Sequence, residues 1–324
     1  MKKITVFGGG TGSFVILSAL KQLPVDLAAI VTMTDAGGST GRLRDQLGVL
    51  PPGDLRQCLL ALSEASLLWR RLFLYRFTSG DLRGHNFGNL FLTALEKVTD
   101  NYQAVIDTAS YVLKVKGEVI PVTLEKTHLL ARYADGTVKG NEAEIEANTR
   151  TTSRIVGLEL NPTVQANRRA IARVKQSDWI ILGPGDLFTS IVPILLVKEI
   201  NILLRTTRAK IVYVMNLMTK SGQTTHYSAS DHLRDLEHYL GRPVDLVIVN
   251  RGKIQPDVLE WYLRWRETPV SNDLASGFPR QKRISRDLVD RRKFQKEPGD
   301  VLSRSLVRHD KTKLSRLLKT VILP

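Results

Sequence analysis

The stretch ITVFGGGTGS, residues 4–13, joins a short apolar run to three glycines, a threonine, a fourth glycine and a serine. The apolar run at 3–7 predicts a buried strand, and FVILSALKQL at 14–23 predicts a helix that ends at Pro24. A second apolar run follows at 27–33. This strand, helix, strand order, with strands apolar along their whole length, is typical of a parallel sheet that is covered on both faces.

The alternation of strands and helices returns in the second half of the chain. Strands are expected at 178–182, 210–215 and 245–249, separated by helices at 164–175, 188–204 and 230–240. Between the two halves, GEVIPVT and the Asp135-Gly136 turn predict antiparallel hairpins. The tail at 309–323 predicts a short helix and a closing strand.

We therefore predict an α/β fold, a Rossmann-like doubly wound, mostly parallel sheet with a small antiparallel insertion at about 117–150. We expect residues 1–324 to form one domain that ends in a basic C-terminal segment at about 266–324.

The composition indicates a cytoplasmic protein. An apolar fraction of 43% over 324 residues is enough for a sizeable core. The single cysteine, Cys58, excludes an internal disulfide framework. Strand-like sequence begins directly after Lys2 and Lys3, which leaves no room for a signal peptide, and Gly and Pro interrupt the longest apolar stretch, 179–204. We expect no membrane span.

The formal net charge of +15 predicts an anionic partner: nucleic acid, acidic lipid or a phosphorylated small molecule. Residues 251–324 hold 18 Lys and Arg against 9 Asp and Glu, which gives +9 of that total. A solvated basic face is the alternative interpretation. The basic stretch at 280–296 lacks the interleaved aromatic residues of a base-stacking surface, so we do not expect nucleic-acid binding.

Four loops rich in Gly, Ser and Thr lie where predicted strands end or predicted helices begin. Glycine lets a phosphate approach the backbone, and the amides and dipole of a helix N-terminus favour its charge. Tight packing of strand-to-helix turns is the alternative for each loop taken singly. Together they predict these ligand-binding residues: Gly8, Gly9, Gly10, Thr11, Gly12, Ser13, Asp35, Gly37, Gly38, Ser39, Arg42, His85, Asn89, Gly183, Pro184, Gly185, Asp186, Thr189 and Ser190.

The first loop departs from two familiar nucleotide motifs. A G-x-G-x-x-G fingerprint would need glycine at the position of Ser13, although Asp35 lies where its ribose-binding acid belongs. A nicotinamide or flavin enzyme therefore stays an alternative. No lysine follows the glycines, which excludes a Walker A loop.

Several polar residues have two interpretations each. Asp35 and Asp54 could hold Mg²⁺ beside a diphosphate, whereas Asp54 could also be an ordinary helix N-cap. Asp186 could cap its helix or contact a ligand hydroxyl. His85 could donate to a phosphate, act as an acid or base, or fix its loop. Arg42 could clamp a phosphate or lie exposed on a helix.

The order of motifs resembles a known family. FGGGTGS, TDAGGSTGRLRDQLGVLPPGDLRQCLLAL, GHNFGNL, GEVIPVT, GPGDLFTSIVPILLV, VYVMNLMTKSGQT and DLVIVN are similar to the YvcK-like gluconeogenesis factors, a branch of the CofD superfamily. The resemblance runs from about residue 4 to 250, with a fainter match at His309-Asp310.

The resemblance implies a bacterial protein linked to cell shape and to cell-wall precursor supply during gluconeogenic growth, which binds UDP-sugars such as UDP-N-acetylglucosamine. It implies that Gly53-Asp54 and Asn216 join the four loops around the nucleotide. The related CofD enzymes are Mg²⁺-dependent 2-phospho-L-lactate transferases that use a nucleotide-activated substrate. Ala36 stands where the family often has a second acid, which weakens the metal prediction.

Two functions therefore remain. The first is a regulatory protein that binds nucleotide sugars, acts through protein partners and forms a homo-oligomer. The second is a CofD-like transferase with Mg²⁺ on Asp35 and Asp54.

Overall fold

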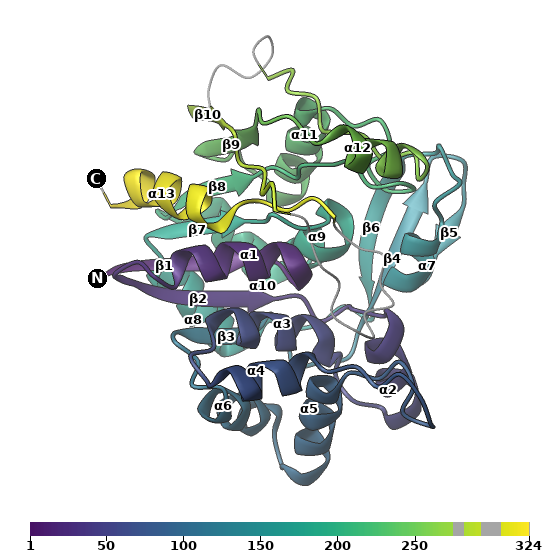
Figure 1. The fold of residues 1–324 in the computed structure, drawn as a ribbon, viewed down its shortest axis with the longest axis vertical. Helices are drawn as coiled ribbons and strands as arrows, with labels where there is room; N and C mark the ends of the chain where they lie inside the picture. Colours follow the sequence, from purple (N-terminus) through teal and green to yellow (C-terminus); the bar gives the residue numbers. More distant parts are fainter. Residues whose placement is uncertain (275–281, 293–305, 324) are drawn as a thin grey trace.

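The computed structural model describes residues 1–274, 282–292 and 306–323. Its centre is a seven-stranded sheet in the order β10-β9-β8-β7-β1-β2-β3, in which every neighbouring pair is parallel (Figure 1). The strands are β1 (Lys2–Phe7), β2 (Val25–Val31), β3 (Glu118–Pro121), β7 (Trp179–Leu182), β8 (Lys210–Val214), β9 (Leu246–Asn250) and β10 (Lys282–Arg286). The predicted doubly wound, parallel sheet is confirmed.

Helices cover both faces of this sheet, which explains why its central strands β1, β2, β7, β8 and β9 are apolar on both sides, whereas the edge strand β10 is polar. On one face α1 (Gly10–Leu20) packs against α3 (Pro52–Leu62) and α13 (Lys311–Ile322). Behind the sheet in Figure 1, α10 (Lys198–Thr206) packs between α8 (Arg168–Gln176) and α11 (Ala229–Leu240).

Two helices begin inside the glycine-rich loops, earlier than the sequence predicts. Helix α1 begins at Gly10, and α2 (Gly38–Leu47) begins at Gly38. Glycine is a poor helix former, so sequence reasoning assigned these residues to loops. Glycine is tolerated in the first turn of a helix. The glycine-rich residues from Gly10 and from Gly38 onward therefore form the first turns of α1 and α2. Three further helices lie between β2 and β3: α4 (Leu67–Leu74), α5 (Phe87–Val98) and α6 (Tyr102–Val112).

The predicted small antiparallel sheet is confirmed, but its bounds differ from 117–150. The first strand of that segment is β3, the parallel edge strand of the main sheet. The small antiparallel sheet has the order β5-β4-β6, with β4 (His128–Tyr133), β5 (Val138–Lys139) and β6 (Ile155–Asn161), so it extends past residue 150. Helix α7 (Glu142–Ala147) lies where a hairpin was expected. Its start is fixed by Asn141, whose side chain accepts from the Glu144 amide at 3.0 Å.

The C-terminal segment also differs from its prediction. Residues Lys311–Ile322 form one helix and no closing strand, because Leu314, Leu318 and Ile322 recur at helical spacing and are buried. The basic stretch at 280–296 supplies the edge strand β10, while its residues 280–281 and 293–296 lie outside the described residues.

The predicted helix at 188–204 is broken into a π-helical turn η1 (Leu187–Ile191), α9 (Val192–Leu195) and α10. Among the described residues, no single helix has the length and apolar character needed to cross a membrane. The bent pair Leu187–Leu195 and Lys198–Thr206, at 82°, meets that test by length and composition alone.

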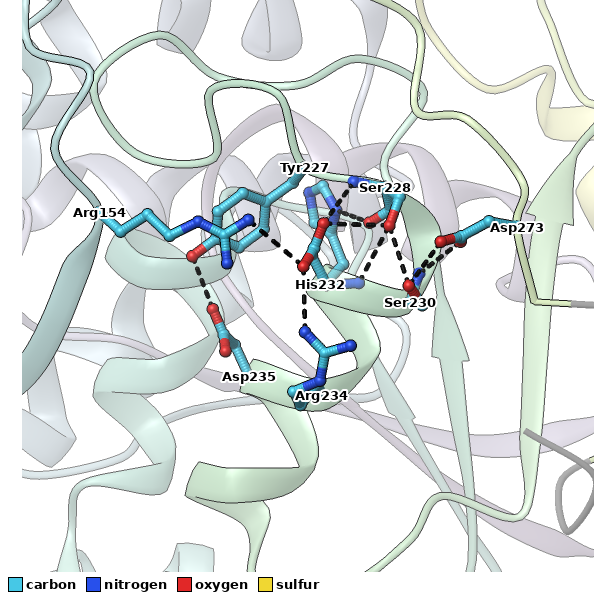
Figure 2. Close-up of polar contacts among 9 residues, drawn as sticks. Arg154, Tyr227, Ser228, Ser230, His232, Arg234, Asp235 and Asp273 are labelled. Atoms are coloured by element: carbon cyan, nitrogen blue, oxygen red, sulfur yellow. Dashed lines mark hydrogen bonds and ion pairs between the residues drawn. The ribbon is translucent and has the colours of Figure 1, made fainter. Parts of the chain in front are cut away.

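A polar network joins the small sheet to α11 (Figure 2). Arg154, next to β6, lies over the Tyr227 ring at 4.8 Å and pairs with Asp231 at 3.4 Å. The Tyr227 hydroxyl donates to Asp235 at 2.7 Å, and Ser228 forms a capping box with Asp231 at the start of α11. These contacts cap a helix and hold the small sheet in place, so we interpret the network as structural.

Candidate functional site

The ends of three strands meet at the point where the strand order reverses. Strands β1 and β7 are neighbours, and the chain continues from β1 to β2 on one side and from β7 to β8 on the other, which makes this the switch point of the sheet, where open α/β sheets bind ligands at the carboxyl ends of their strands. A Cβ on Gly12 would overlap the Pro184 carbonyl oxygen and lie 3.0 Å from the Gly185 nitrogen. The Gly185 amide donates to Asn216 Oδ1 at 3.3 Å. The first and fourth loops and the end of β8 thus come together as predicted.

The two candidate metal ligands also come together, at the start of α3. A Cβ on Gly53 would overlap an Asp35 carboxylate oxygen, and one on Gly9 would overlap the Asp54 carboxylate. Asp54 is the third residue of α3, whose N-cap is Pro51, so the N-cap alternative for Asp54 is wrong. The absence of side chains at Gly9 and Gly10 therefore leaves space for the Asp54 carboxylate.

A third acid, which sequence reasoning missed, approaches the same place from the small sheet. Glu142 Oε2 accepts from the Ala36 amide at 2.7 Å. Burial, and then the negative charges of Asp35, Glu146 and Asp54, raise the pKa of Glu142 well above its ordinary value. The sequence does contain a sign of this helix: Asn141 precedes Glu144 by three residues, which is typical of a helix start. Because the segment was interpreted as a hairpin, this sign was not used.

We expect Glu142→Gln to stabilise the protein at pH 8 relative to the wild type. The pKa of Glu142 is raised by folding, so its contribution to stability is present below the ordinary pKa of glutamate and is lost as the pH rises. Glutamine keeps an oxygen for the Ala36 amide and carries no charge. The difference in melting temperature between variant and wild type should shrink from pH 8 to pH 5. Exposed Glu159→Gln is the control, and an equal pH dependence in both variants would contradict the assignment.

The third loop is held mainly by bonds within the protein. Ser39 Oγ lies 3.2 Å from His85 Nδ1, and Asn89 Nδ2 donates to Ser39 Oγ at 3.3 Å. Burial, with the charges of Arg42 and Arg76, lowers the pKa of His85, so its ring is neutral near pH 7. Of the open alternatives for His85, these contacts favour fixing the loop. Exposed Arg42 lies beside this loop: it donates to the Arg83 carbonyl at 3.0 Å, and a Cβ on Gly84 would lie 2.9 Å from Arg42 Nη2.

In the segments that follow β1, β7 and β8, three side chains have buried polar atoms with no hydrogen-bond partner within the described part of the chain. They are the hydroxyls of Ser13 and Thr189 and both amide atoms of Gln223. Thr189 lies in η1, whose N-cap is Asp186, and π-helical turns are rare and often functional. Buried polar atoms normally find a partner, so these groups are candidates for contact with a ligand. Sequence reasoning missed Gln223 because no glycine-rich loop marks it.

The remaining predicted residues fall into the same loops. Gly183 has φ +71°, and a Cβ on it would lie 3.1 Å from the Val214 carbonyl oxygen, while the Gly37 amide donates to Asp35 Oδ1 at 2.9 Å. Gly8 lies against Ser13, Ser190 lies against Gly185, and Thr11 and Gly38 lie in the first turns of α1 and α2. Within the described ranges, no group of three or more His, Cys, Asp or Glu side chains is arranged to hold a metal ion.

Comparisons with known proteins agree with this architecture. The family model described as 2-phospho-L-lactate transferase CofD matches residues 4–289. A protein of Aquifex aeolicus named "Putative gluconeogenesis factor" is 40% identical over 99% of this chain and 98% of its own length. The "Gluconeogenesis factor" of Bacillus subtilis is 38% identical over 98% of this chain and 96% of its own.

A crystal structure of a UPF0052 family member from Bacillus halodurans superposes with a TM-score of 0.87 at 34% identity, and it covers 98% of both chains. The matched span includes all four glycine-rich loops and the three acids. The chain therefore belongs to the CofD family, alongside relatives that are named gluconeogenesis factors.

Proposed function

We propose that this protein is a cytoplasmic gluconeogenesis factor that binds a nucleotide sugar, such as UDP-N-acetylglucosamine, and regulates cell-wall precursor supply and cell shape. The observation that carries the proposal is the contact between Gly12 and the 184–185 backbone. It places the N-terminus of α1 beside the loop after β7 at the switch point of the sheet, where ligands of open α/β sheets bind.

The acidic side chains shape the proposed binding mode. The Asp54 carboxylate lies against Gly9 and Gly10 at the N-terminus of α1, where a helix attracts an oxyanion. A diphosphate beside Asp54 and Asp35 would be repelled unless a cation lay between them. Two carboxylates plus phosphate oxygens suit Mg²⁺, so these residues fit that ion once a diphosphate is present. Bound Mg²⁺ would neutralise the diphosphate charge.

We assign the diphosphate to the 8–13 loop and to residues 183–185, and the ribose or sugar hydroxyls to Asp186 and Asn216. A carboxylate repels a neighbouring diphosphate. The same carboxylate accepts hydrogen bonds from sugar hydroxyls. The hydroxyls of Ser13 and Thr189 supply further partners from buried positions.

Differential scanning fluorimetry tests this proposal. UDP-N-acetylglucosamine at about 100 times its dissociation constant should stabilise the protein by about 2.7 kcal/mol when Mg²⁺ is present. Asp35→Asn and Asp54→Asn should each remove the magnesium-dependent part of the shift, while the exposed Asp81→Asn should keep it. A melting temperature that no nucleotide sugar changes would contradict the proposed ligand.

The CofD match and the carboxylates of Asp35 and Asp54, which lie against Gly53 and Gly9, favour a second candidate, a Mg²⁺-dependent transferase that resembles 2-phospho-L-lactate transferase. The chain has Ala36 beside Asp35, which leaves one carboxylate at that turn. Magnesium-dependent turnover of a nucleotide-activated phospho-acyl donor, lost in Asp54→Asn, would establish this activity. Binding without turnover would leave the regulatory role.

A regulator needs a protein to act on, so we also propose a protein partner and a homo-oligomeric state. Nucleic-acid binding is not proposed. Arg291 and Arg292 of the basic stretch pair with Asp287 and Asp290 at 3.0 and 2.6 Å, which uses part of its charge within the protein.

A further inference from the structure

Helix α4 exposes large apolar side chains together. The exposed fractions of Leu67 and Leu68 are 70% and 76%, and that of Trp69 is 40%. Within α4 the buried residue is Phe73, which packs against Phe87 and Phe91 of α5. Single exposed apolar residues are ordinary, but adjacent ones at the start of a helix indicate a surface that binds a protein or a membrane.

Several cationic residues lie near the start of α4. Residues 62–65, just before α4, are bonded to 113–116: the Glu64 amide donates to the Lys114 carbonyl and the Lys116 amide to the Leu62 carbonyl, both at 3.0 Å. The two lysine side chains are exposed. We call Leu67, Leu68, Lys21, Arg70, Lys114 and Lys116 the α4 surface.

Lys21 joins this group from the end of α1. Its Nζ donates to the Ser63 carbonyl at 2.8 Å. Partial burial, and then the positive charge of Arg70, lower the pKa of Lys21, with Lys116 adding to the effect and Glu64 opposing it. Lys21 therefore lies close enough to Arg70 and Lys116 to be repelled by them, and an anion at this place would relieve that repulsion.

The α4 surface lies at the opposite edge of the sheet from the glycine-rich loops. Lys21 follows the last turn of α1 and precedes β2, and Lys116 precedes β3, so both lie where strands begin. The glycine-rich loops that follow β1 and β7 lie where strands end. A partner on the α4 surface would thus lie away from the proposed ligand site.

We propose that the α4 surface attaches the protein peripherally to an anionic phospholipid bilayer. Leucine side chains suit the boundary between headgroups and acyl chains, and Lys and Arg suit lipid phosphates. Nucleic acid offers the cations a partner but gives the leucines none. A second copy of this chain, related by a two-fold axis, would place these cations opposite themselves. This attachment goes beyond the proposed binding of a nucleotide sugar and does not depend on it.

Vesicle co-sedimentation of the full chain tests the attachment. The protein should sediment with vesicles of equimolar phosphatidylglycerol and phosphatidylcholine, remain in solution with phosphatidylcholine alone, and be released by salt. Leu67→Ser/Leu68→Ser should weaken binding at least about tenfold. Lys114→Gln/Lys116→Gln should weaken it by about fivefold per charge, and these exposed lysines give a second reading if the leucine variant does not fold.

Val156→Ser/Ile202→Ser is the matched control, because these side chains are 64% and 51% exposed on other elements. It should bind vesicles as the wild type does. Equal sedimentation of the wild type with both vesicle types would overturn the proposal. Unchanged vesicle binding of both the leucine variant and the lysine variant would overturn it as well. A dimer that dissociates on Leu67→Ser/Leu68→Ser, without vesicle binding, would instead assign this surface to a second copy.

Discussion

We expect Gly12→Ala to destabilise the protein by about 2 kcal/mol and to abolish its stabilisation by UDP-N-acetylglucosamine. A methyl group on Gly12 meets the Pro184 carbonyl group, and backbone cannot swing aside as a flexible side chain can. Alanine is better than glycine inside a helix by about 1 kcal/mol, so helix propensity alone predicts the opposite sign. Thermal melts with and without the nucleotide sugar measure both effects.

Gly157→Ala is the control for this prediction. A methyl group there would lie 3.9 Å from Arg132 Cβ, an ordinary contact, so its melting temperature and ligand response should match those of the wild type. If Gly12→Ala were as stable as the wild type and still responded to the ligand, the 8–13 and 183–190 loops would not need their close contact.

The largest loss of stability is expected for Arg173→Ala, about 3 kcal/mol, because it removes a buried guanidinium that pairs with a partly exposed carboxylate and donates to two carbonyl groups and a hydroxyl. The guanidinium, 6% exposed, pairs with the Asp26 carboxylate at 2.8 Å and donates to the Ile4 and Asp26 carbonyls at 3.1 and 2.7 Å. Its Nε donates to the Thr5 hydroxyl at 3.1 Å. These bonds tie α8 to β1 and β2, so urea unfolding should show a lower midpoint.

Arg169→Ala, on the same helix, is the matched control. Arg169 pairs with Glu118 at 2.9 Å, but its side chain is 44% exposed, and surface pairs contribute at most about 1 kcal/mol. Equal losses in the two variants would show that burial of Arg173 adds nothing to its ion pair. Lysine at 173 should recover only part of the loss, since it lacks the planar fork of arginine.

Local patterns in the sequence were sufficient to predict the order of the strands and helices. They were not sufficient to predict which strands pair with each other. The run EVIP predicts a strand, yet whether it pairs in a hairpin or at the edge of the main sheet depends on β2, which offers it an open edge. The helical turn at Glu142 was hidden because Asp135-Gly136 nearby is a strong hairpin signal. The apolar periodicity of α13, in contrast, could have excluded the closing strand.

The sequence by itself determined the parallel α/β sheet and placed the glycine-rich loops at its carboxyl edge, because strand hydrophobicity and turn residues are local properties. Only the tertiary structure decided that Asp35, Asp54 and Glu142 share one place and that Gly12 meets Pro184. The bond from Ala36 to Glu142 joins residues 106 positions apart. Such contacts depend on how helices pack on both faces of the sheet, which no window of neighbouring residues contains.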